Sequence, residues 1–446
     1  MHLKLILSSA FLALALISRT LAQQPIDSGL EKFKPLPAPK YSRLFLKKGD
    51  RLAICGDSIT EQKMYSRIME DYLTMCVPQL DITVRQFGWS GEKAPGFLAR
   101  MTNDCLRFKP TVATTCYGMN DHLYKPYEEQ IGKTYREKSA AIDEAFKANG
   151  VRMIQGSAGC VGKMPTWVKS ANGTVDDLNL NLCTLRNIGI ELAEKEKVRF
   201  ADVFWPMMVA GAEARKNYSP DYAISGKDGV HPGWAGHTVM AYAFLKAFGL
   251  DGEIGKLTVD LKSNKMKPSE GHEVISQKNG EFQIKSTRYP FCACVPETNG
   301  PPTYPVCAND DLKKDTSIHS GMTLIPFNQE LNRFILVAKN GKAGKYRLEW
   351  SNESKVFTSE QLAQGINLAA EFTSNPFCEA FSKVDSAVAA KQAYETTQIK
   401  KLFRSPGAKI DMEGVAAESE KERAPLAEAI HAAFVPVTHT IKIIPE

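Results

Sequence analysis

The chain has 446 residues, of which 43% are hydrophobic and 24% are charged, and its formal net charge is +6. This length allows two or three domains. The positive charge is small and scattered, with no basic tract interleaved with aromatic residues, so we expect no nucleic-acid partner.

The N-terminus has the pattern of a signal peptide. Lys4 precedes an apolar run at residues 5–17, and Thr20-Leu21-Ala22 offers small residues for cleavage near Ala22. The apolar run is shorter than the ~20 residues that a spanning helix needs. Residues 1–22 therefore predict a secreted or periplasmic protein without a membrane span. Residues 23–44 are polar and contain prolines, which is typical of an arm or linker.

From about residue 45 to 250, predicted strands alternate with predicted helices. The strands are expected at 52–55, 82–87, 111–116, 151–154 and 198–203, and the helices at 60–76, 95–105, 128–148, 175–195 and 234–248. Residues 207–230 have a looser pattern. The alternation predicts βαβ units with a parallel sheet between helices, which is an α/β domain.

Residues 251–446 have a different pattern. Short strands are expected at 258–261, 281–284, 334–338, 346–350 and 355–358, so a mainly-β module is predicted. Residues 359–403 are mostly helical, residues 409–425 are charged and poorly periodic, and 438–444 could return as an edge strand. The pattern leaves open whether 359–446 belong to the β module or wrap the first domain.

Ten cysteines in an exported chain make disulfides possible. Cys292, Cys294 and Cys307 flank a Pro/Gly/Asn-rich loop and are the best local candidates, whereas Cys55 and Cys116 fall on strands and are expected to be buried thiols. No Cys/His set has the spacing of a zinc site, so we expect no metal and no cofactor.

Ser58 lies at the turn between the first strand and the first helix. Open α/β sheets bind ligands at this carboxyl edge, and helix N-termini provide unpaired N–H groups for an oxyanion. Ser, Thr and Asp are also ordinary helix N-caps, which is the simpler interpretation of this stretch alone.

Three further loops carry groups that serine chemistry needs. His231 could act as the base and Asp228, three residues earlier, could orient it. Asn120 and Gly91 could donate hydrogen bonds to an oxyanion. Each also has a plain interpretation as a turn, loop or helix-entry residue, but their joint occurrence at one predicted sheet edge favours a nucleophilic serine site.

Four short motifs resemble the SGNH (GDSL-type) hydrolases over about residues 45–250. They are Gly-Asp-Ser-Ile-Thr at 56–60, Ser-Gly-Glu at 90–92, Gly-Met-Asn-Asp at 118–121 and Asp-Gly-Val-His-Pro at 228–232. The resemblance implies a flavodoxin-like three-layer α/β/α fold and metal-independent ester hydrolysis. It assigns Ser58 as nucleophile, His231 as base and Asp228 as its orienter, with Ser58, Gly91 and Asn120 forming the oxyanion hole. Trp89 is unusual before the second motif, so Gly88 is a second candidate for the glycine donor.

The substrate is expected to be a small-molecule or polysaccharide ester, with carbohydrate O-acetyl groups favoured. Asp57, Trp89, Tyr117, His122 and Trp234 are candidates for contacting it, although aromatic residues also fill cores. A lipid or aryl esterase is the alternative within the class, and a carbohydrate-binding protein that works through its C-terminal module is the alternative outside it. A metallophosphoesterase and an α/β-hydrolase are disfavoured because their motifs are missing.

Overall fold

The computed structural model describes residues 29–168, 173–293 and 311–446. The expected signal peptide lies outside these residues, as do Cys294 and Cys307. The chain divides into two units after Lys34. In the first unit the described residues form the 3-10 helix η1 (Glu31–Phe33). All other elements belong to the second unit, residues 35–446.

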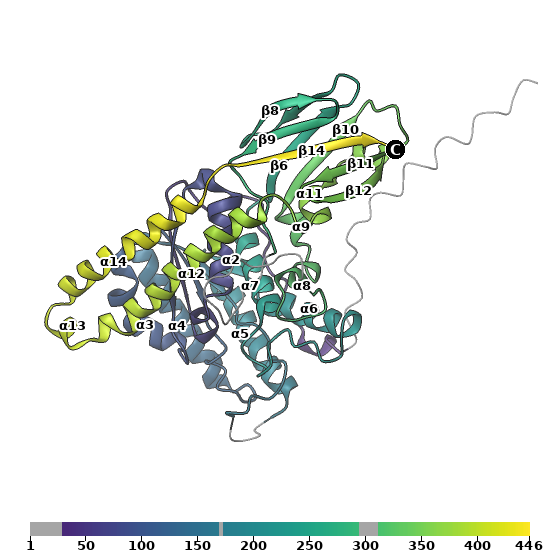
Figure 1. Cartoon of the computed structure of the whole chain (residues 1–446). Coiled ribbons are helices and arrows are strands. Elements are labelled where there is room, and N and C mark those ends of the chain that lie inside the picture. Colours follow the sequence, from purple (N-terminus) through teal and green to yellow (C-terminus); the bar gives the residue numbers. More distant parts are fainter. Residues whose placement is uncertain (1–28, 169–172, 294–310) are drawn as a thin grey trace, which may run out of the picture. The chain divides into compact units, whose positions relative to one another are not determined.

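A five-stranded parallel sheet forms the centre of the expected α/β domain (Figure 1). Its strands, in the spatial order β2-β1-β3-β4-β5, are β2 (Thr83–Gly88), β1 (Arg51–Gly56), β3 (Val112–Cys116), β4 (Arg152–Gly156) and β5 (Arg199–Ala201). All four neighbouring pairs are parallel. Because parallel strands point the same way, the loops after β1, β2 and β3 open on one edge of the sheet.

Helices cover both faces of this sheet, which confirms the three-layer α/β/α architecture. The helices of the domain are α1 (Ser58–Glu61), α2 (Tyr65–Asp71), α3 (Ala94–Asp104), α4 (Glu129–Ala148), α5 (Val175–Glu196), α6 (Phe204–Asn217) and α7 (Trp234–Ala247), with short turns η2 (Tyr72–Cys76), η3 (Pro78–Leu80) and η4 (Leu106–Phe108). Ala53 and Cys55 of β1 pack in one buried cluster with α3 and α4. Tyr65 of α2 stacks on Phe244 of α7, with ring centroids 5.7 Å apart. Alternate residues of each strand thus face different helical layers, as expected for a sheet buried on both sides.

The helix expected at 60–76 is broken in the structure, so that prediction is wrong. Lys63 has a positive φ of 59° between α1 and α2. One long-range and one short-range contact fix the new start at Tyr65. The Tyr65 N–H donates to His237 Nδ1 at 3.2 Å, and the Tyr65 hydroxyl lies 2.8 Å from Thr60 Oγ1. Helix propensity of the segment is overridden by these buried hydrogen bonds.

The C-terminal region contains two sheets. One has the order β13-β10-β6-β7 and the other β12-β11-β14-β9-β8. Their strands are β6 (Glu253–Asp260), β7 (Lys265–Pro268), β8 (His272–Lys278), β9 (Glu281–Ser286), β10 (Arg333–Lys339), β11 (Lys345–Trp350), β12 (Glu353–Thr358), β13 (Ile366–Asn367) and β14 (Val437–Pro445). Short helices α8 (Ile318–Thr323), α9 (Phe327–Glu330), α10 (Ser359–Gln364) and α11 (Leu368–Glu371) connect them.

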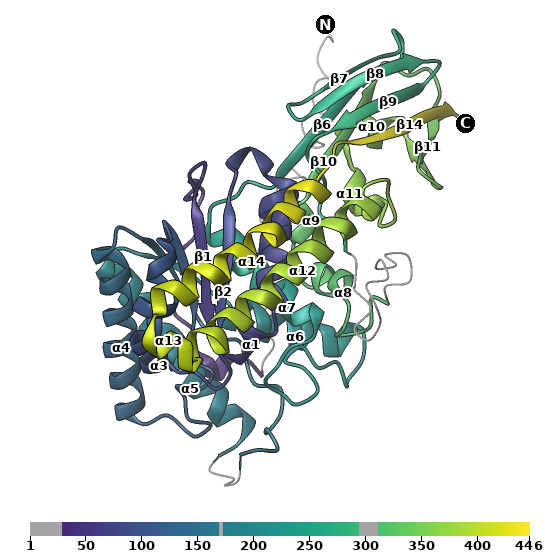
Figure 2. The ribbon, with the colours of Figure 1, turned by 60° about the vertical axis from the view of Figure 1, so that its left-hand side comes forward.

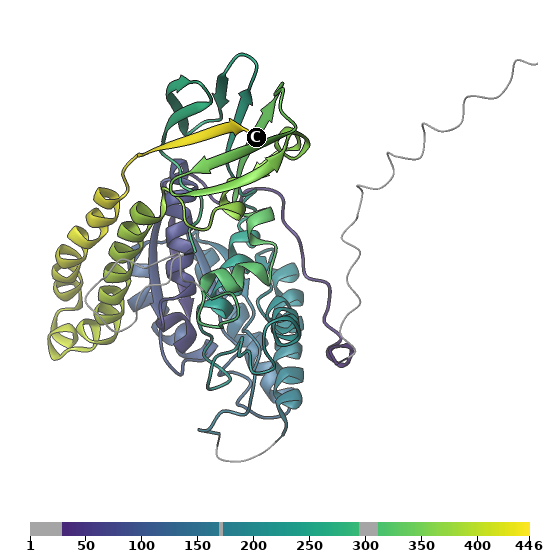
Figure 3. The same cartoon turned by 45° about the vertical axis from the view of Figure 1, so that its right-hand side comes forward.

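The last strand does not lie at an edge, contrary to the sequence expectation. β14, the yellow strand in Figure 3, pairs antiparallel with both β11 and β9. In this register Ile441 lies between Trp350 and Phe282. Ile441 and Trp350 are fully buried. The alternating pattern identified the strand, but its position depends on neighbours that are distant in the sequence.

A helical hairpin connects the β module to the parallel sheet. It consists of α12 (Cys378–Lys400), η6 (Leu402–Arg404), α13 (Pro406–Ile410) and α14 (Met412–Ala433), and it lies along the edge strand β2 (Figure 2). The helix α14 was not expected, because residues 409–425 lack an apolar stripe. Its contacts with α12 include polar ones: the Tyr394 hydroxyl donates to Glu422, and Gln398 donates to Ser419 Oγ at 2.8 Å. Apolar packing occurs at the start of α14, where Ala416 joins a buried cluster with Ile399 of α12. So short an apolar segment gives little hydrophobic periodicity to detect.

All eight cysteines in the described part of the chain are free thiols, and Cys55 and Cys116 are buried as expected. Cys292 is also buried, but its proposed partners lie outside the described residues. Among the described residues, no helix combines the length and the apolar character that a membrane crossing requires.

The buried carboxyl of Asp143 on α4 gives a pH-dependent stability prediction. Burial raises its pKa to about 7, and Oδ2 has no hydrogen-bond partner among the described residues. An unfolded aspartate has a pKa of about 3.9. Between these values the folded protein binds the extra proton, so the free energy of unfolding falls as pH rises from about 4 to about 7.

Asp143→Asn removes this titration. We expect the variant to be more stable than the wild type at pH 8, by about 1 kcal/mol or more, with the difference vanishing near pH 4. Urea unfolding at several pH values measures it. An equal stability difference at pH 4 and pH 8 would contradict the assignment.

Candidate active site

Ser58 is the first residue of α1, two residues after the end of β1. Asp57 caps this helix, because its Oδ1 accepts the Ile59 N–H at 3.0 Å. The cap expected for this turn is therefore Asp57, and the Ser58 side chain is left to point elsewhere. Its Oγ lies 2.8 Å from His231 Nε2, and the residue is half-buried.

Asp228 organises the loop that carries His231. One carboxylate oxygen, Oδ1, accepts the backbone N–H groups of Val230 and His231, both at 2.9 Å. The other, Oδ2, lies 2.7 Å from His231 Nδ1. One side chain thus fixes both the turn and the imidazole orientation, which explains the three-residue spacing between them.

The hydrogen bonds define the tautomer of His231. An ionised carboxylate only accepts, so Nδ1 carries the proton that Asp228 receives. Nε2 is then free to accept from the Ser58 hydroxyl. Burial acts to raise the pKa of Asp228, but the hydrogen bonds from the His231 and Val230 N–H groups and from the imidazole outweigh it and lower that pKa. Asp228 is accordingly a carboxylate at neutral pH.

Gly91 and Asn120 lie in the loops after β2 and β3. Gly91 has a positive φ of 74° in the turn that the Glu92 N–H closes onto Trp89 O at 3.1 Å. In the described part of the chain the Gly91 N–H has no partner, whereas the Gly88 N–H is occupied by Gln86 Oε1 at 2.9 Å. Of the two candidate glycines, Gly91 therefore has the available donor.

Gly88 has a different role, which is steric. A Cβ at Gly88 would lie 2.2 Å from the backbone nitrogen of Glu61. Only glycine lets β2 approach the first turn after Ser58 this closely. Asn120 Nδ2 donates one proton to Glu92 O at 3.0 Å, so one amide proton remains for a ligand.

Two buried acids lie beneath this edge. Burial, with the Asp121 and Glu92 charges, raises the pKa of Asp57 to about 7 despite the Ile59 N–H bond. Burial raises the pKa of Asp121 to about 6, although it accepts the Ala94 and Gly118 N–H groups, both at 2.9 Å. Asp121 thereby ties the loop after β3 to the start of α3.

Most of the residues expected to contact substrate are buried in the structure. Asp57 and Trp234 are buried, and Tyr117 is part of the core, with its hydroxyl donating to Glu92 at 2.8 Å. His122 is also buried, and its Nε2 has no hydrogen-bond partner among the described residues. Trp89 is half-buried against the same core cluster.

Sequence reasoning missed two aromatic residues, Trp167, which contacts the His231 imidazole, and Tyr124, which contacts Trp167. The Trp167 ring lies 5.8 Å from the His231 ring and 6.2 Å, edge-on, from the Tyr124 ring. Tyr124 in turn contacts His122 at 4.6 Å. Trp167 is 45% exposed, which is unusual for a tryptophan. Its place in a Gly/Pro-containing loop directly after the fourth strand was the only available signal.

No group of three or more His, Cys, Asp and Glu side chains in the described residues is arranged to hold a metal ion. The geometry instead joins a hydroxyl, an imidazole and a carboxylate in one hydrogen-bonded chain. This arrangement can activate the hydroxyl as a nucleophile.

The α/β domain is similar in sequence to known proteins. Residues 54–239 match the model of the GDSL-like Lipase/Acylhydrolase family. An acetylxylan esterase of Geobacillus stearothermophilus is 25% identical over 222 residues, covering 46% of this chain and 95% of its own.

Solved structures show how far the fold extends. A gut microbial diltiazem-metabolizing enzyme is 21% identical, covers 91% of this chain and 100% of its own, and has a TM-score of 0.70. This likeness is one of fold, and it includes the C-terminal region. The structure of the Geobacillus stearothermophilus acetylxylan esterase is 21% identical, covers 46% of this chain and 97% of its own, and has a TM-score of 0.38.

Proposed function

Because residues 54–239 belong to the GDSL-like lipase/acylhydrolase family, an esterase-type hydrolase family, we propose that this protein cleaves esters through Ser58, His231 and Asp228. The observation that carries the proposal is the chain of contacts from Ser58 Oγ to His231 Nε2 at 2.8 Å and from His231 Nδ1 to Asp228 Oδ2 at 2.7 Å.

In the proposed reaction, Ser58 Oγ attacks the ester carbonyl carbon while its proton moves to His231 Nε2. The resulting imidazolium is stabilised by the Asp228 carboxylate. The negative charge that develops on the carbonyl oxygen is met by the Ser58 and Gly91 N–H groups and the second Asn120 amide proton. His231 then protonates the leaving alcohol, and an acyl-Ser58 intermediate remains.

Water completes the cycle. His231 takes a proton from a water molecule, which attacks the acyl carbon, and the carboxylic acid leaves as Ser58 regains its proton. The same donors stabilise both tetrahedral intermediates. Every atom that the two half-reactions need is supplied by the protein, the ester and water.

We propose carbohydrate O-acetyl groups as the substrate. The acetylxylan esterase relative supports an acetyl ester. The exposed Trp167 face beside His231 supports a cyclic alcohol portion, because aromatic faces pack well against sugar rings. We further propose that residues 1–22 direct export, where acetylated polysaccharide would be met.

Hydrolysis of p-nitrophenyl acetate tests the mechanism. We expect Ser58→Ala, His231→Ala and Asp228→Asn each to lower kcat/KM by about 10³-fold or more, because each interrupts the same proton path. The exposed Ser263→Ala variant is the matched control and should retain full activity. Wild-type activity in Ser58→Ala would refute the mechanism.

The substrate proposal is tested with acetylated xylo-oligosaccharides. Trp167→Ala should raise KM for these sugars about 10-fold, which corresponds to loss of one stacking contact, and should change p-nitrophenyl acetate hydrolysis less than twofold. A series of p-nitrophenyl esters with acyl chains of increasing length tests the alternative, a lipid esterase. Faster hydrolysis of octanoate than acetate esters would favour a lipid esterase instead.

Export is tested by expressing the full chain in a bacterial host and sequencing the N-terminus of the recovered protein. We expect a protein outside the cytoplasm that begins at about Gln23. A cytoplasmic protein that retains Met1 would contradict the proposal.

A further inference from the structure

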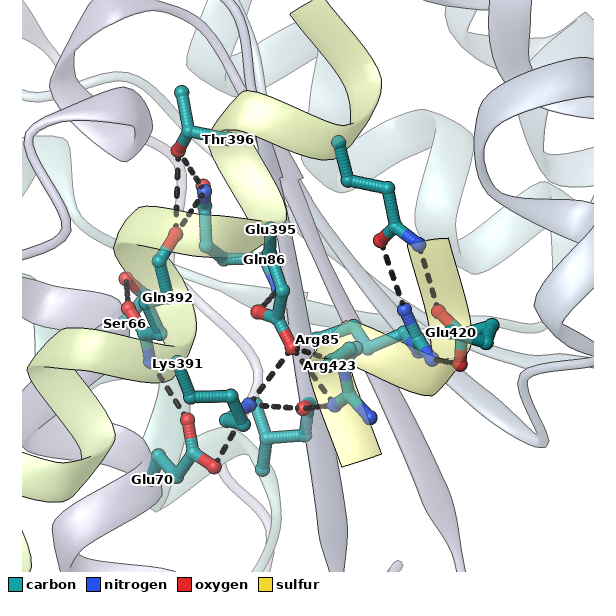
Figure 4. Close-up of polar contacts among 12 residues, drawn as sticks. Ser66, Glu70, Arg85, Gln86, Lys391, Gln392, Glu395, Thr396, Glu420 and Arg423 are labelled. Atoms are coloured by element: carbon teal, nitrogen blue, oxygen red, sulfur yellow. Dashed lines mark hydrogen bonds and ion pairs between the residues drawn. The ribbon is translucent and has the colours of Figure 1, made fainter. Parts of the chain in front are cut away.

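The helical hairpin lies outside the matched residues 54–239, yet it is fixed firmly to the catalytic domain. Lys391 on α12 is 1% exposed, and its Nζ donates to Val84 O of the edge strand β2 at 2.6 Å. Its charge is balanced by Glu70 of α2 and Glu395 of α12, at 3.0 and 2.9 Å (Figure 4). Buried, mutually satisfied ions of this kind hold one geometry, because breaking any pair leaves an uncompensated charge.

The end of α12 reaches the loop that follows β2. Lys400, the last residue of the helix, donates to both carboxylate oxygens of Glu61, at 2.6 and 2.9 Å. Glu61 Oε2 in turn accepts both the backbone N–H and the hydroxyl of Ser90, each at 2.5 Å. Glu61 is three residues after Ser58, and Ser90 directly precedes Gly91. One carboxylate therefore joins the nucleophile helix to the Gly91 turn.

A second route runs from the hairpin to the other end of this turn. Arg404 donates to Asp104 at 2.9 and 2.5 Å, and Asp104 also contacts Arg100. Arg100 holds the Glu92 carboxylate through two hydrogen bonds, of 2.6 and 2.7 Å. The Glu92 carbonyl is the acceptor of Asn120 Nδ2. The turn 89–92 is thus anchored at Ser90 and at Glu92.

Trp89 is surrounded by the cations of both routes. Lys400 Nζ lies 5.3 Å from its ring centroid, and the guanidinium carbons of Arg404 and Arg100 lie at 5.1 and 5.0 Å. These contacts explain why a tryptophan occupies this unusual position before the second motif. It is a packing surface for the hairpin end.

Of the three cations around Trp89, Lys400 is the one whose effect on the Gly91 turn can be tested by itself, because it acts on the Glu61 carboxylate. Burial acts to raise the pKa of Glu61, while Lys400 and the two Ser90 hydrogen bonds lower it, so the carboxylate is ionised. The neighbouring Lys63 binds the Glu61 main-chain carbonyl at 2.7 Å and so does not replace Lys400 on the carboxylate. Lys400 itself is 29% exposed and makes no contact with the triad side chains.

We propose that Lys400 is a positioning residue. It holds Glu61, which binds the Ser90 N–H and hydroxyl, so that the neighbouring Gly91 N–H keeps the orientation needed for acyl transfer. The proposal rests on the esterase mechanism described above. In this proposal, a residue more than 150 positions beyond the matched residues 54–239 influences the rate of the chemical step. The hairpin then contributes to the geometry of the active site.

The test compares Lys400→Met with the wild type on p-nitrophenyl acetate. We expect kcat to fall about 10- to 100-fold with KM within about twofold, because a misplaced donor weakens transition-state binding more than substrate binding. Phosphonylation of Ser58 by an aryl phosphonate, which also forms an anionic oxygen, should slow in parallel. Lys400→Arg, which keeps the charge and donors, should recover most of the loss.

Lys421→Met is the matched control. Lys421 is on α14 of the same hairpin and pairs at 2.6 Å with Glu418, but both side chains are 71% exposed. We expect its kcat to equal that of the wild type. In a Glu61→Ala background, Lys400→Met should cause no further loss, since both changes act through one carboxylate.

The outcomes separate this inference from the proposed function. If hydrolysis requires Ser58 but Lys400→Met retains wild-type kcat, the positioning role is wrong and the esterase mechanism stands. Additive losses in the double variant would also overturn it. If Ser58→Ala is as active as the wild type, the mechanism itself fails. Thermal unfolding of each variant shows whether lost activity reflects lost fold.

Discussion

Strand β2 lies at the edge of the parallel sheet and has a neighbouring strand on one side only. The need to cover its outer backbone groups is the constraint on which the position of the C-terminal hairpin depends. An edge strand exposes N–H and C=O groups that another strand or another chain could pair with. Here side chains of the hairpin take them: Lys391 and Arg423 donate to Val84 O, and Glu395 accepts the Gln86 N–H at 3.1 Å. The C-terminal region therefore closes the parallel sheet without extending it.

The side chains that cover the β2 edge are charged, and burying them costs free energy. Their mutual ion pairs offset this desolvation cost. Burial works to raise the pKa of Glu395, but the cations of Lys391, Arg423 and Arg85 outweigh it and lower that pKa. Removal of one partner from such a set typically costs about 3–5 kcal/mol. These ion pairs consequently hold the hairpin in one position against β2. After the hairpin the chain continues as β14, a central strand of the second β sheet.

The position of the hairpin affects the candidate active site. Because α12 is fixed at Lys391, its last residue Lys400 arrives at Glu61, next to the nucleophile helix. In the Asp228 loop, by contrast, Asp228 orients His231 through hydrogen bonds over two and three residues, and a backbone bond from Gly162 to Gly229 holds the loop. The Asp228–His231 pair is therefore encoded locally, while the side of the candidate site that carries the Gly91 turn depends on contacts more than 300 residues apart.

The sequence by itself determined the parallel five-stranded sheet, the sheet edge to which the Ser58, Gly91 and Asn120 loops belong, and the resemblance of this domain to the GDSL-type hydrolases. It could do so because strand periodicity and turn residues act locally and parallel strands share one carboxyl edge. The catalytic roles of these residues stay predictions. Only the tertiary structure decided the break at Lys63, the central place of β14, the helix α14, and the approach of Trp167 and Lys400. Each of these depends on hydrogen bonds, ring contacts or ion pairs between distant segments, which no local pattern records.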